Sequence, residues 1–562
     1  MPESSNFLLD FFRLTKQFWC SKQKLKIRGT VLLLALLTIL QMAMAVLLTQ
    51  WSADLFNALE QHSMRDLLIQ VGLLLFLFVA GMLVTGAHLV VKRNLQIYWR
   101  EWMTDYVISR WMKDARHYLI SHLPGKYDNP DGRIAEDCRI AADSAVGLGH
   151  TLFYSICLLV GFTQVLWSHS GVVTLDIGLV QIPIYGHLIW IAILYSAFAT
   201  WFGWLVGRPL TSATDARQSA EANFRASLLE AQENSQAIAL IHAEGCERHQ
   251  FRVLFRILRV VRDEQTVAWR NILMFGTGYS TLSMAFPILI SAPRYILGTI
   301  TLGALVQSAQ AFQHMASALS WPANNLGAIA EWRASVERIF GLLRVLDIAD
   351  EEFAKTEHRI QVKSLGRPVL AFHDLCIVKQ DGRVLAQNIN MEIGKGEHVL
   401  ITGNSFTGAK LFRAIAGIRP WGSGQIEIPS QGRLFFMPPR PHLPAGTLRS
   451  AICYPSSRRV YTREQIEQAL RVVNLENLID KLDERERWGN ILSPGEQQRL
   501  GMVRLLLNRP QWIFLQEAFD SLDYQDQERM LKLICEQIPD ATLLTITHMP
   551  SSSTFYSRHL AL

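Results

Sequence analysis

The chain has 562 residues, of which 49% are hydrophobic and only 19% are charged, and its mean hydropathy is positive, at +0.14. A wholly soluble globular protein with this share of charged residues rarely reaches a positive value, so the composition indicates that part of the chain lies in lipid. The net charge of +6 does not point to nucleic acid, because the basic residues lie beside apolar stretches rather than in one polar tract. A membrane surface is the partner that this charge distribution favours.

Seven cysteines are scattered along the chain without a Cys-x-x-Cys pair or a cluster at metal-ligand spacing. We therefore expect ordinary buried thiols. The N-terminal residues carry several charges before the first apolar run, and no small-residue cleavage pattern closes that run convincingly. We interpret the run as an uncleaved membrane anchor.

Six apolar stretches are each about 20 residues long, which is enough for a helix to cross a hydrocarbon core of ~30 Å. They cover residues 29–50, 67–91, 149–168, 183–206, 272–297 and 300–323. None contains Asp or Glu, although Pro287, Pro293 and several glycines interrupt the last two. We predict a polytopic α-helical membrane domain of six spans over residues 1–340.

Lys and Arg are distributed unevenly between the connections, and they accumulate on the cytoplasmic side of membrane proteins. Residues 1–28 hold six, 92–148 nine and 207–271 nine, whereas 51–66 holds one and 169–182 none. This pattern predicts an inner-membrane protein whose N-terminus and two long connections are cytoplasmic. The long connections show helical apolar spacing, so we expect the membrane helices to continue into them; a soluble subdomain inserted between spans is the alternative.

From about residue 340 short apolar runs typical of strands alternate with helical stretches, which is the pattern of an α/β nucleotide-binding fold. The predicted strands are 369–372, 398–402, 434–437, 512–515 and 541–545. We predict a linker over 341–363 and a cytoplasmic nucleotide-binding domain over 364–562.

A near match to the phosphate-binding pattern GxxxxGK[ST] follows the strand 398–402. In that pattern backbone N–H groups cradle phosphates, the lysine reaches the β and γ phosphates and the hydroxyl holds magnesium. Here Ala409 occupies the lysine position, Lys410 the hydroxyl position, and Phe406 stands where a glycine normally allows close approach of the backbone. The candidate phosphate contacts are Gly403, Asn404, Ser405, Thr407, Gly408 and Lys410.

The missing lysine contact is charge-assisted and worth about 1.5–3 kcal/mol, so we expect ATP affinity to fall on the order of tenfold to a hundredfold. Lys410 offers a partial substitute, although a shift of one helical position turns a side chain by ~100°.

Further motifs make the C-terminal part resemble an ABC transporter ATPase. Residues 492–498 are similar to the LSGGQ signature, with Pro494 in place of a glycine, and 512–517 are similar to the Walker B strand. The resemblance implies catalytic roles for Glu517 and His548; a purely structural role in the fold is the alternative. It also implies nucleotide contacts from Ser493, Gly495, Gln497 and Asp523.

Three departures from the family pattern concern the nucleotide and its metal. Gln516 replaces the Walker B aspartate, and a neutral amide is a weak magnesium ligand. Pro439 replaces the glutamine that senses magnesium and couples to the membrane helices, and no aromatic residue lies between His373 and Asn404 to stack on adenine. We therefore expect ATP to bind weakly. We assign no metal ligand, because Gln516 stands at the usual magnesium carboxylate position and Mg²⁺ binding is not expected to be strong there.

The N-terminal part resembles the bacterial SbmA/BacA-like and peroxisomal fatty-acyl ABC half-transporters. The resemblance rests on the stretches 99–105, 128–137, 237–240 and 330–334. It implies that the segment after the second span couples the two domains. A helix capped by Asp128 or Asn129 at its start is a simpler explanation of the segment, and it is compatible with that role. The candidate coupling residues are Asp128, Asn129, Pro130, Asp131, Arg133 and Glu221.

The resemblance implies a homodimer of half-transporters whose two ATP sites carry the same changes. Three functions are compatible with the sequence: an ATP-driven transporter with a weak site, an ion-gradient-driven transporter with a vestigial nucleotide domain, and a non-transporting membrane protein. The absence of carboxylates from the spans argues against a proton relay.

The solute is not defined by the sequence, since relatives in the family handle peptides, fatty acyl-CoAs and cobalamin. A polar stripe on the sixth span, formed by Gln307, Gln310 and His314, is a candidate for the pathway lining. Hydrogen bonding between helices is the alternative explanation for the stripe.

Overall fold

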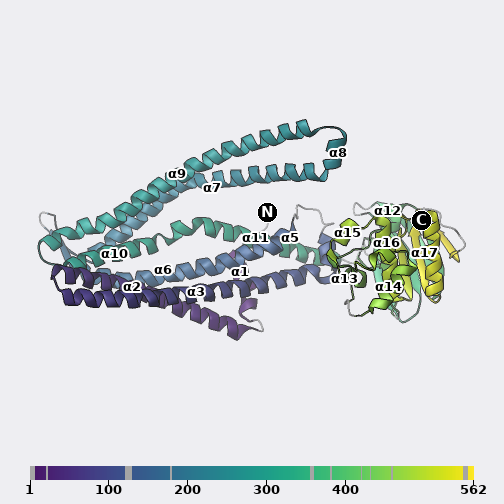
Figure 1. Ribbon diagram of the computed structural model, residues 1–562, viewed down its shortest axis with the longest axis horizontal. Coiled ribbons are helices and arrows are strands. Elements are labelled where there is room, and N and C mark those ends of the chain that lie inside the picture. The colour runs from purple at the N-terminus through teal and green to yellow at the C-terminus, as the bar shows by residue number, and fades with distance from the viewer. Residues whose placement is uncertain are drawn as a thin grey trace. The chain divides into compact units, whose positions relative to one another are not determined.

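The structure is a computed structural model that describes residues 7–20, 23–120, 129–177, 180–354, 360–379, 383–418, 421–430, 432–456, 460–548 and 555–562. These residues form two compact units (Figure 1). The first, the membrane unit, contains the described residues up to Lys113 and from Asn129 to Leu346. The second, the nucleotide unit, contains those from Asp347 onward together with Asp114–Ile120.

Long helices make up the membrane unit. They are α1 (Phe7–Trp19), α2 (Lys24–Glu60), α3 (Met64–Met112), α5 (Pro130–Gly132), the π-helical turn η3 (Arg133–Asp137), α6 (Cys138–Ser170), α7 (His187–Glu233), α8 (Ser235–Leu240), α9 (Glu244–Ile296), α10 (Leu302–Leu319) and α11 (Trp321–Ala354). A short antiparallel pair, β1 (Val172–Ile177) and β2 (Val180–Tyr185), joins α6 to α7. A 3₁₀ turn (Lys113–Ala115) and α4 (Arg116–Leu119) follow α3.

Among the described residues five helical segments are long and apolar enough to cross a membrane. They contain the first five predicted spans apart from the start of the fourth and the last residue of the fifth. The fourth prediction begins too early, because residues 183–185 belong to β2 and α7 starts at His187. The sixth predicted span corresponds to α10, in which glutamine and histidine side chains lower the hydropathy. A break at Ser320 separates α10 from α11.

The membrane helices continue well beyond the predicted spans instead of enclosing a separate soluble subdomain. α3 continues to Met112. α7 continues to Glu233, α9 begins at Glu244, and the short α8 connects them. α7 packs along α9, and Figure 1 shows this hairpin diverging from α2, α3 and α6. The expectation of extended helices is thus confirmed for the described residues.

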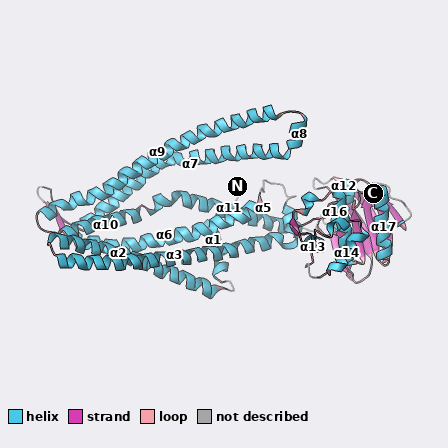
Figure 2. Ribbon diagram, in the orientation of Figure 1, coloured by secondary structure: helices cyan, strands magenta, loops and turns pink. Residues whose placement is uncertain are grey.

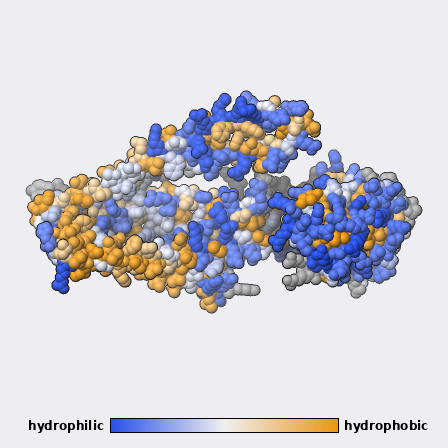
Figure 3. All heavy atoms as spheres, viewed as in Figure 1, coloured by the Kyte–Doolittle hydropathy of each residue, from blue (hydrophilic) through white to orange (hydrophobic). Residues whose placement is uncertain are grey.

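The core of the membrane unit lies where α6, α7 and α10 meet. Phe162, Leu166 and Phe312 are fully buried there. The outward surface of α2, α3 and α6 is strongly apolar in Figure 3, as expected for helices that face lipid. The expectation that all cysteines are buried is wrong, because Cys20 and Cys246 are exposed.

Two main sheets organise the nucleotide unit (Figure 2). A parallel sheet has the order β13 (Arg558–Ala561), β6 (His398–Thr402), β12 (Thr542–Thr547), β11 (Trp512–Gln516), β8 (Leu434–Met437). A mixed sheet has the order β3 (Gln361–Leu365), β7 (Gly422–Pro429), β4 (Leu370–Val378), β5 (Val384–Ile393). A two-stranded pair joins β9 (Gly446–Thr447) to β10 (Arg485–Glu486).

Helices bury the central strands of the parallel sheet. α12 (Ser405–Ile415) packs against β11 and β12, and α16 (Pro494–Asn508) and α17 (Tyr524–Gln537) share a hydrophobic core with these strands. The remaining helices are α13 (Leu448–Cys453), α14 (Arg463–Val472), a 3₁₀ turn (Glu476–Leu478) and α15 (Trp488–Ile491). Every residue of β11 and β12 is buried, which explains why both strands read as apolar runs in the sequence. The predicted strands at 398–402 and 434–437 match β6 and β8 residue for residue.

Candidate functional site

The candidate nucleotide site lies at the carboxyl ends of three neighbouring parallel strands. β12 pairs with β6 on one side and with β11 on the other, and Thr547 lies opposite Thr402 in the register. The segments that follow these strands contain Gly403, Glu517 and His548. Ligands of open α/β sheets bind at this edge, because the loops after parallel strands all emerge there.

The phosphate-binding segment takes a more helical form than the sequence pattern suggests. α12 begins at Ser405, and the Gly408 N–H donates to the carbonyl oxygen of Asn404 at 3.0 Å. Asn404 caps the helix, since its side-chain oxygen accepts from the N–H of Phe406 at 2.9 Å. The N–H of Gly408 is therefore used inside the helix. An anion can still meet the unbonded N–H groups of the first turn, as at any helix N-terminus.

Lys410 lies inward from this turn and is only 3% exposed. Its Nζ is 4.0 Å from the centre of the half-exposed Phe406 ring, so the cation rests on the aromatic face. Gly408 also has no room for a side chain, because a Cβ there would lie 2.7 Å from Ile546. A phosphate role for Lys410 would require its ammonium to leave the Phe406 ring.

Glu517 connects the phosphate-binding segment to the end of β12. Its Oε1 accepts a short hydrogen bond from the Ser405 hydroxyl and lies 3.1 Å from Nδ1 of His548. Asp520 approaches the same ring nitrogen, with its Oδ2 3.5 Å from Nδ1. Burial raises the pKa of the Asp520 carboxyl and the Glu517 charge raises it further, whereas His548 acts in the opposite direction.

Glu517, Asp520 and His548 are also the residues that could hold a metal ion at this edge. One ligand atom from each lies within 4.8 Å of the others. Sequence reasoning missed Asp520, which lies three residues beyond the predicted Walker B glutamate. The buried Gln516 closes β11 beside this group, and its amide adds no charge for a cation. The residues present thus fit a divalent cation, but through a carboxylate other than the one that the family pattern provides.

The signature segment forms the start of α16. Ser493 is the N-cap of α16, and its hydroxyl and Glu496 form a reciprocal capping box. Pro494 follows at the first helical position, where a proline is favourable because it has no N–H to leave unbonded. Gln497 donates to the carbonyl oxygens of Gly489 and Leu492 at 2.9 Å. The candidate residues of this segment therefore all have local structural roles.

Asp523 and the segment around Pro439 are joined to the signature helix. Asp523 caps α17 by accepting from the N–H of Asp526 at 2.8 Å. The buried Gln498 donates to the carbonyl oxygen of Pro439 at 3.1 Å and accepts from the N–H of Ser521 at 3.0 Å. Gly495 approaches the same region, since a Cβ there would lie 3.2 Å from Leu522.

The predicted coupling residues lie at surface positions of the membrane unit, except that Asp128 lies outside the described residues. Asn129 precedes α5 with a left-handed backbone and makes no side-chain cap hydrogen bond, so the simple capping explanation is wrong for this residue. Pro130, Asp131 and Arg133 form the first turns that lead into α6, and Glu221 is exposed on α7.

An ion pair that the sequence did not reveal fixes the start of α6 to α11. The Nε–H of Arg338 donates a bifurcated hydrogen bond to both carboxylate oxygens of Asp137, at 2.9 and 3.0 Å, and Nη2 donates one more. Asp137 is 5% exposed, and its hydrogen bond with the Arg338 guanidinium, together with its charge, raises the pKa of that guanidinium. Asp137 belongs to one of the stretches that carry the family resemblance, and it contacts Arg338 across 201 residues of sequence.

The polar stripe on α10 is enclosed between helices of the membrane unit. The Gln310 amide donates to the Ser52 hydroxyl at 3.0 Å, and the His314 ring stacks on Phe162 at 4.4 Å. Gln307 is half-buried on the same helix. Two of the three residues thus have partners on neighbouring helices, and a role for the stripe in the pathway remains a prediction.

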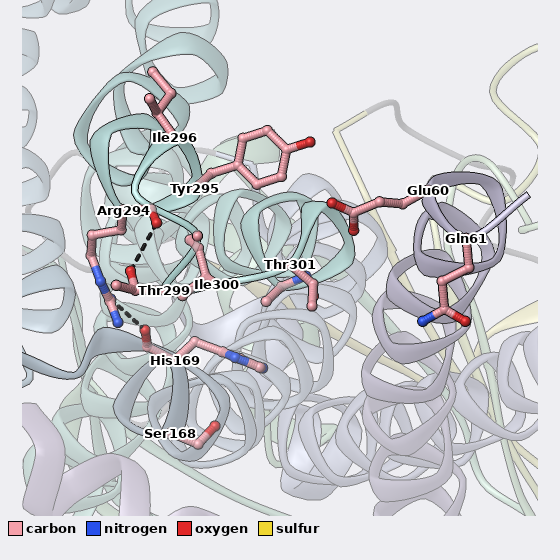
Figure 4. Close-up of a pocket in the computed structure, with 12 residues that line it drawn as sticks. Glu60, Gln61, Ser168, His169, Arg294, Tyr295, Ile296, Thr299, Ile300 and Thr301 are labelled. Atoms are coloured by element: carbon pink, nitrogen blue, oxygen red, sulfur yellow. Dashed lines mark hydrogen bonds between the residues drawn. The ribbon is translucent and has the colours of Figure 1, made fainter.

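A separate cavity of about 870 Å³ lies where the ends of α2, α6, α9 and α10 meet (Figure 4). Glu60 contributes an oxygen that accepts from the N–H of Leu302 at 3.0 Å. The Arg294 guanidinium donates to the carbonyl oxygen of His169 at 2.8 Å, as the dashed line in Figure 4 marks. Both charged side chains therefore contact backbone groups at helix ends, as well as lining the cavity.

Two protein families match the chain. The ABC transporter transmembrane region 2 matches residues 14–295, and the ABC transporter family matches residues 386–520. Among curated proteins, the inner membrane ABC transporter ATP-binding protein YddA of Escherichia coli (strain K12) is 29% identical, with 96% of this chain and 94% of that protein covered. ATP-binding cassette sub-family D member 3 of Homo sapiens is 25% identical, with 82% and 73% covered.

A solved structure of a bacterial Atm1-family ABC exporter with ATP bound has the same fold, with a TM-score of 0.69 and 17% sequence identity. The alignment covers 95% of this chain and 93% of the exporter chain. A helical membrane domain followed by an ABC ATPase domain is therefore confirmed as the architecture. With family matches in both halves and this shared fold, the chain belongs to the ABC transporters, as a half-transporter that joins one membrane domain to one ATP-binding domain.

Proposed function

We propose that two copies of this half-transporter form a homodimer that moves a peptide or an amphipathic, lipid-like solute across the inner membrane. The observation that carries the homodimer is the apolar surface of the α7–α9 hairpin beyond the predicted spans. Leu240 and Ile241 are more than 70% exposed, and the surface also includes Leu229, Phe255 and Val260. Lipid does not reach this part of a membrane helix, so another protein surface has to cover it. A second copy is the partner that a half-transporter requires.

The solute class is inferred from relatives. The human relative and ABC transporter D family member 2 of Arabidopsis thaliana, which is 25% identical over 98% of this chain, belong to sub-family D. The family resemblance connects that group with fatty acyl compounds. The inner-membrane location rests on the printed name of the Escherichia coli relative, and the Lys and Arg counts support a cytoplasmic nucleotide unit.

Nucleotide binding in this proposal is weak and depends little on magnesium. A cation held by Glu517, Asp520 and His548 would still lack the carboxylate that Gln516 replaces. The helical first turn of α12 occupies the N–H of Gly408, and Ala409 brings no cation to the phosphates. Phosphoryl transfer depends almost wholly on positioning and charge stabilisation, so these changes lower hydrolysis as well as binding. Glu517 and His548 retain the positions of a catalytic pair, and a slow ATPase activity follows from them.

Transport by reconstituted protein tests the proposal. Proteoliposomes are supplied with ATP or with a pH gradient separately, and uptake of a fluorescent long-chain acyl-CoA and of a fluorescent cationic peptide is measured. We expect slow ATP-dependent movement of one probe. Probe movement that requires only the pH gradient would show that the gradient, and not ATP, is the energy source. A protein that is monomeric in both detergent and lipid would refute the homodimer.

A further inference from the structure

A pair of histidines joins α3 to α6 inside the membrane unit. Nε2 of His88 lies 2.7 Å from Nε2 of His150, and the two rings are 4.4 Å apart. His88 is 8% exposed, and Nδ1 of His150 is buried without a hydrogen-bond partner. Both residues fall within helical segments that are able to cross a membrane, where ionisable side chains are rare and usually functional.

The geometry defines how many protons the pair can hold. In the neutral pair one Nε2 carries a proton and donates it to the bare Nε2 of the other ring, whose own proton is then on Nδ1. An additional proton from water binds the bare Nδ1 of the donating ring and leaves the bond between the rings intact. A second additional proton would place an N–H on both facing Nε2 atoms, which is not compatible with a separation of 2.7 Å. The pair therefore has one proton-binding step.

The surroundings give that step a consequence for helix packing. Lys92 lies one turn along α3 and interacts electrostatically with both histidines, and Tyr154 stacks on His150 from the next turn of α6. α2 packs against both α3 and α6, and it has no charged residue between Arg28 and Asp54. α11 has no charged residue from its start at Trp321 up to Glu331. On α10, His314 stacks on Phe162, three turns further along α6. On α6 itself, Asp143 lies about two turns from His150 and forms an ion pair with Arg139 at 3.8 Å. Within the described parts of these helices, no carboxylate contacts either histidine.

We propose that His88 and His150 form a one-proton binding site in the membrane unit, and that its protonation loosens the α3–α6 contact and makes transport depend on pH. A protonated pair places a second positive charge beside Lys92, while Asp143, the acidic residue on α6, is paired with Arg139. The repulsion favours separation and hydration of the two helices. The proton site stands on its own geometry, whereas its use in transport rests on the proposed function.

Proton uptake by the full chain in lipid nanodiscs tests the site directly. Burial and the neighbouring Lys92 both disfavour a charge on the pair, so the titration has to run below the ordinary histidine range. Between pH 8 and pH 3 we expect the protein to bind one proton per chain more than the His88→Gln/His150→Gln variant. The glutamine amides can still hydrogen bond across the interface but do not titrate. A difference of zero would show a fixed structural hydrogen bond, and a difference of two would show independent histidines; either result overturns the proposal.

A control variant separates titration from the loss of an interhelical hydrogen bond. Trp321→Phe removes the bond from the Trp321 indole to the Thr151 hydroxyl, 3.0 Å long, which lies next to His150 on α6. We expect this variant to take up as many protons as the unmodified protein. Solid-state NMR of chains with ¹⁵N-labelled histidine should show the pair changing over the same pH range, with signals that disappear in the double variant. Failure of every transport probe would affect only the proposed function, because proton uptake is measured without a solute.

Discussion

Restoring the phosphate lysine should strengthen ATP binding by an amount that follows from the contacts of α12. Ala409→Lys adds a charge-assisted contact worth about 1.5–3 kcal/mol, but freeing the N–H of Gly408 breaks a helical hydrogen bond worth about 0.5–1.5 kcal/mol. The net gain is about 0–2.5 kcal/mol, or up to roughly 70-fold in affinity. Adding Lys410→Ser and Gln516→Asp should restore magnesium dependence, since both supply oxygen ligands for the metal.

Calorimetry with ATP, in the presence and absence of Mg²⁺, measures both effects on the purified full chain. The matched test is Glu517→Gln, made in the native and in the repaired protein. In the native protein it should change ATPase activity little, because tight ATP binding is missing before hydrolysis is reached. In the repaired protein, extended by Phe406→Gly and Pro439→Gln, it should abolish the gained hydrolysis. Brisk ATP hydrolysis by the native chain that Glu517→Gln abolishes would refute the reasoning.

Three further predictions concern other parts of the chain. Arg338→Ala should lower the thermal stability of the membrane unit more than Asp137→Asn, because it leaves a buried carboxylate unpaired. Asp137→Asn leaves only a half-exposed guanidinium and should cost about 1–2 kcal/mol. The opposite order in thermal unfolding would contradict the pairing. In a variant without the other exposed cysteine, Cys20, an impermeant maleimide should label Cys246 in inside-out vesicles but not in intact cells. Cys453, which is 2% exposed, should stay unlabelled in both preparations. Labelling of Cys246 in intact cells would show the opposite orientation. Because the pKa of Asp520 is raised in the folded state, the folded protein holds this proton to higher pH, and the free energy of unfolding falls as pH rises from the ordinary aspartate range through that raised pKa. Asp520→Asn should remove that fall in pH-dependent unfolding, and an unchanged slope would contradict it.

Much of the candidate site follows from the sequence because its residues stand directly after buried strands. The strand at 398–402 predicted where the phosphate segment begins, and the apolar run at 512–515 predicted the position of Glu517. The early start of α12 did not follow. A motif gives the order of residues in a loop, but whether Ser405–Gly408 form a loop or a helical turn depends on the cap by Asn404 and on packing against β12.

The sequence by itself determined the approximate limits of five apolar spans, the α/β character of the C-terminal part and the family, because hydrophobic periodicity and motif spacing are local properties of the chain. Only the tertiary structure decided which distant side chains meet. His88 pairs with His150 across 62 residues, and Asp137 with Arg338 across 201. Such contacts depend on the rotation of each helix about its axis and on the register between helices, and a shift of one residue turns a side chain by ~100°. The sequence contains no local signal that fixes these two quantities, so the proton-binding pair and the ion pair became visible only in the fold.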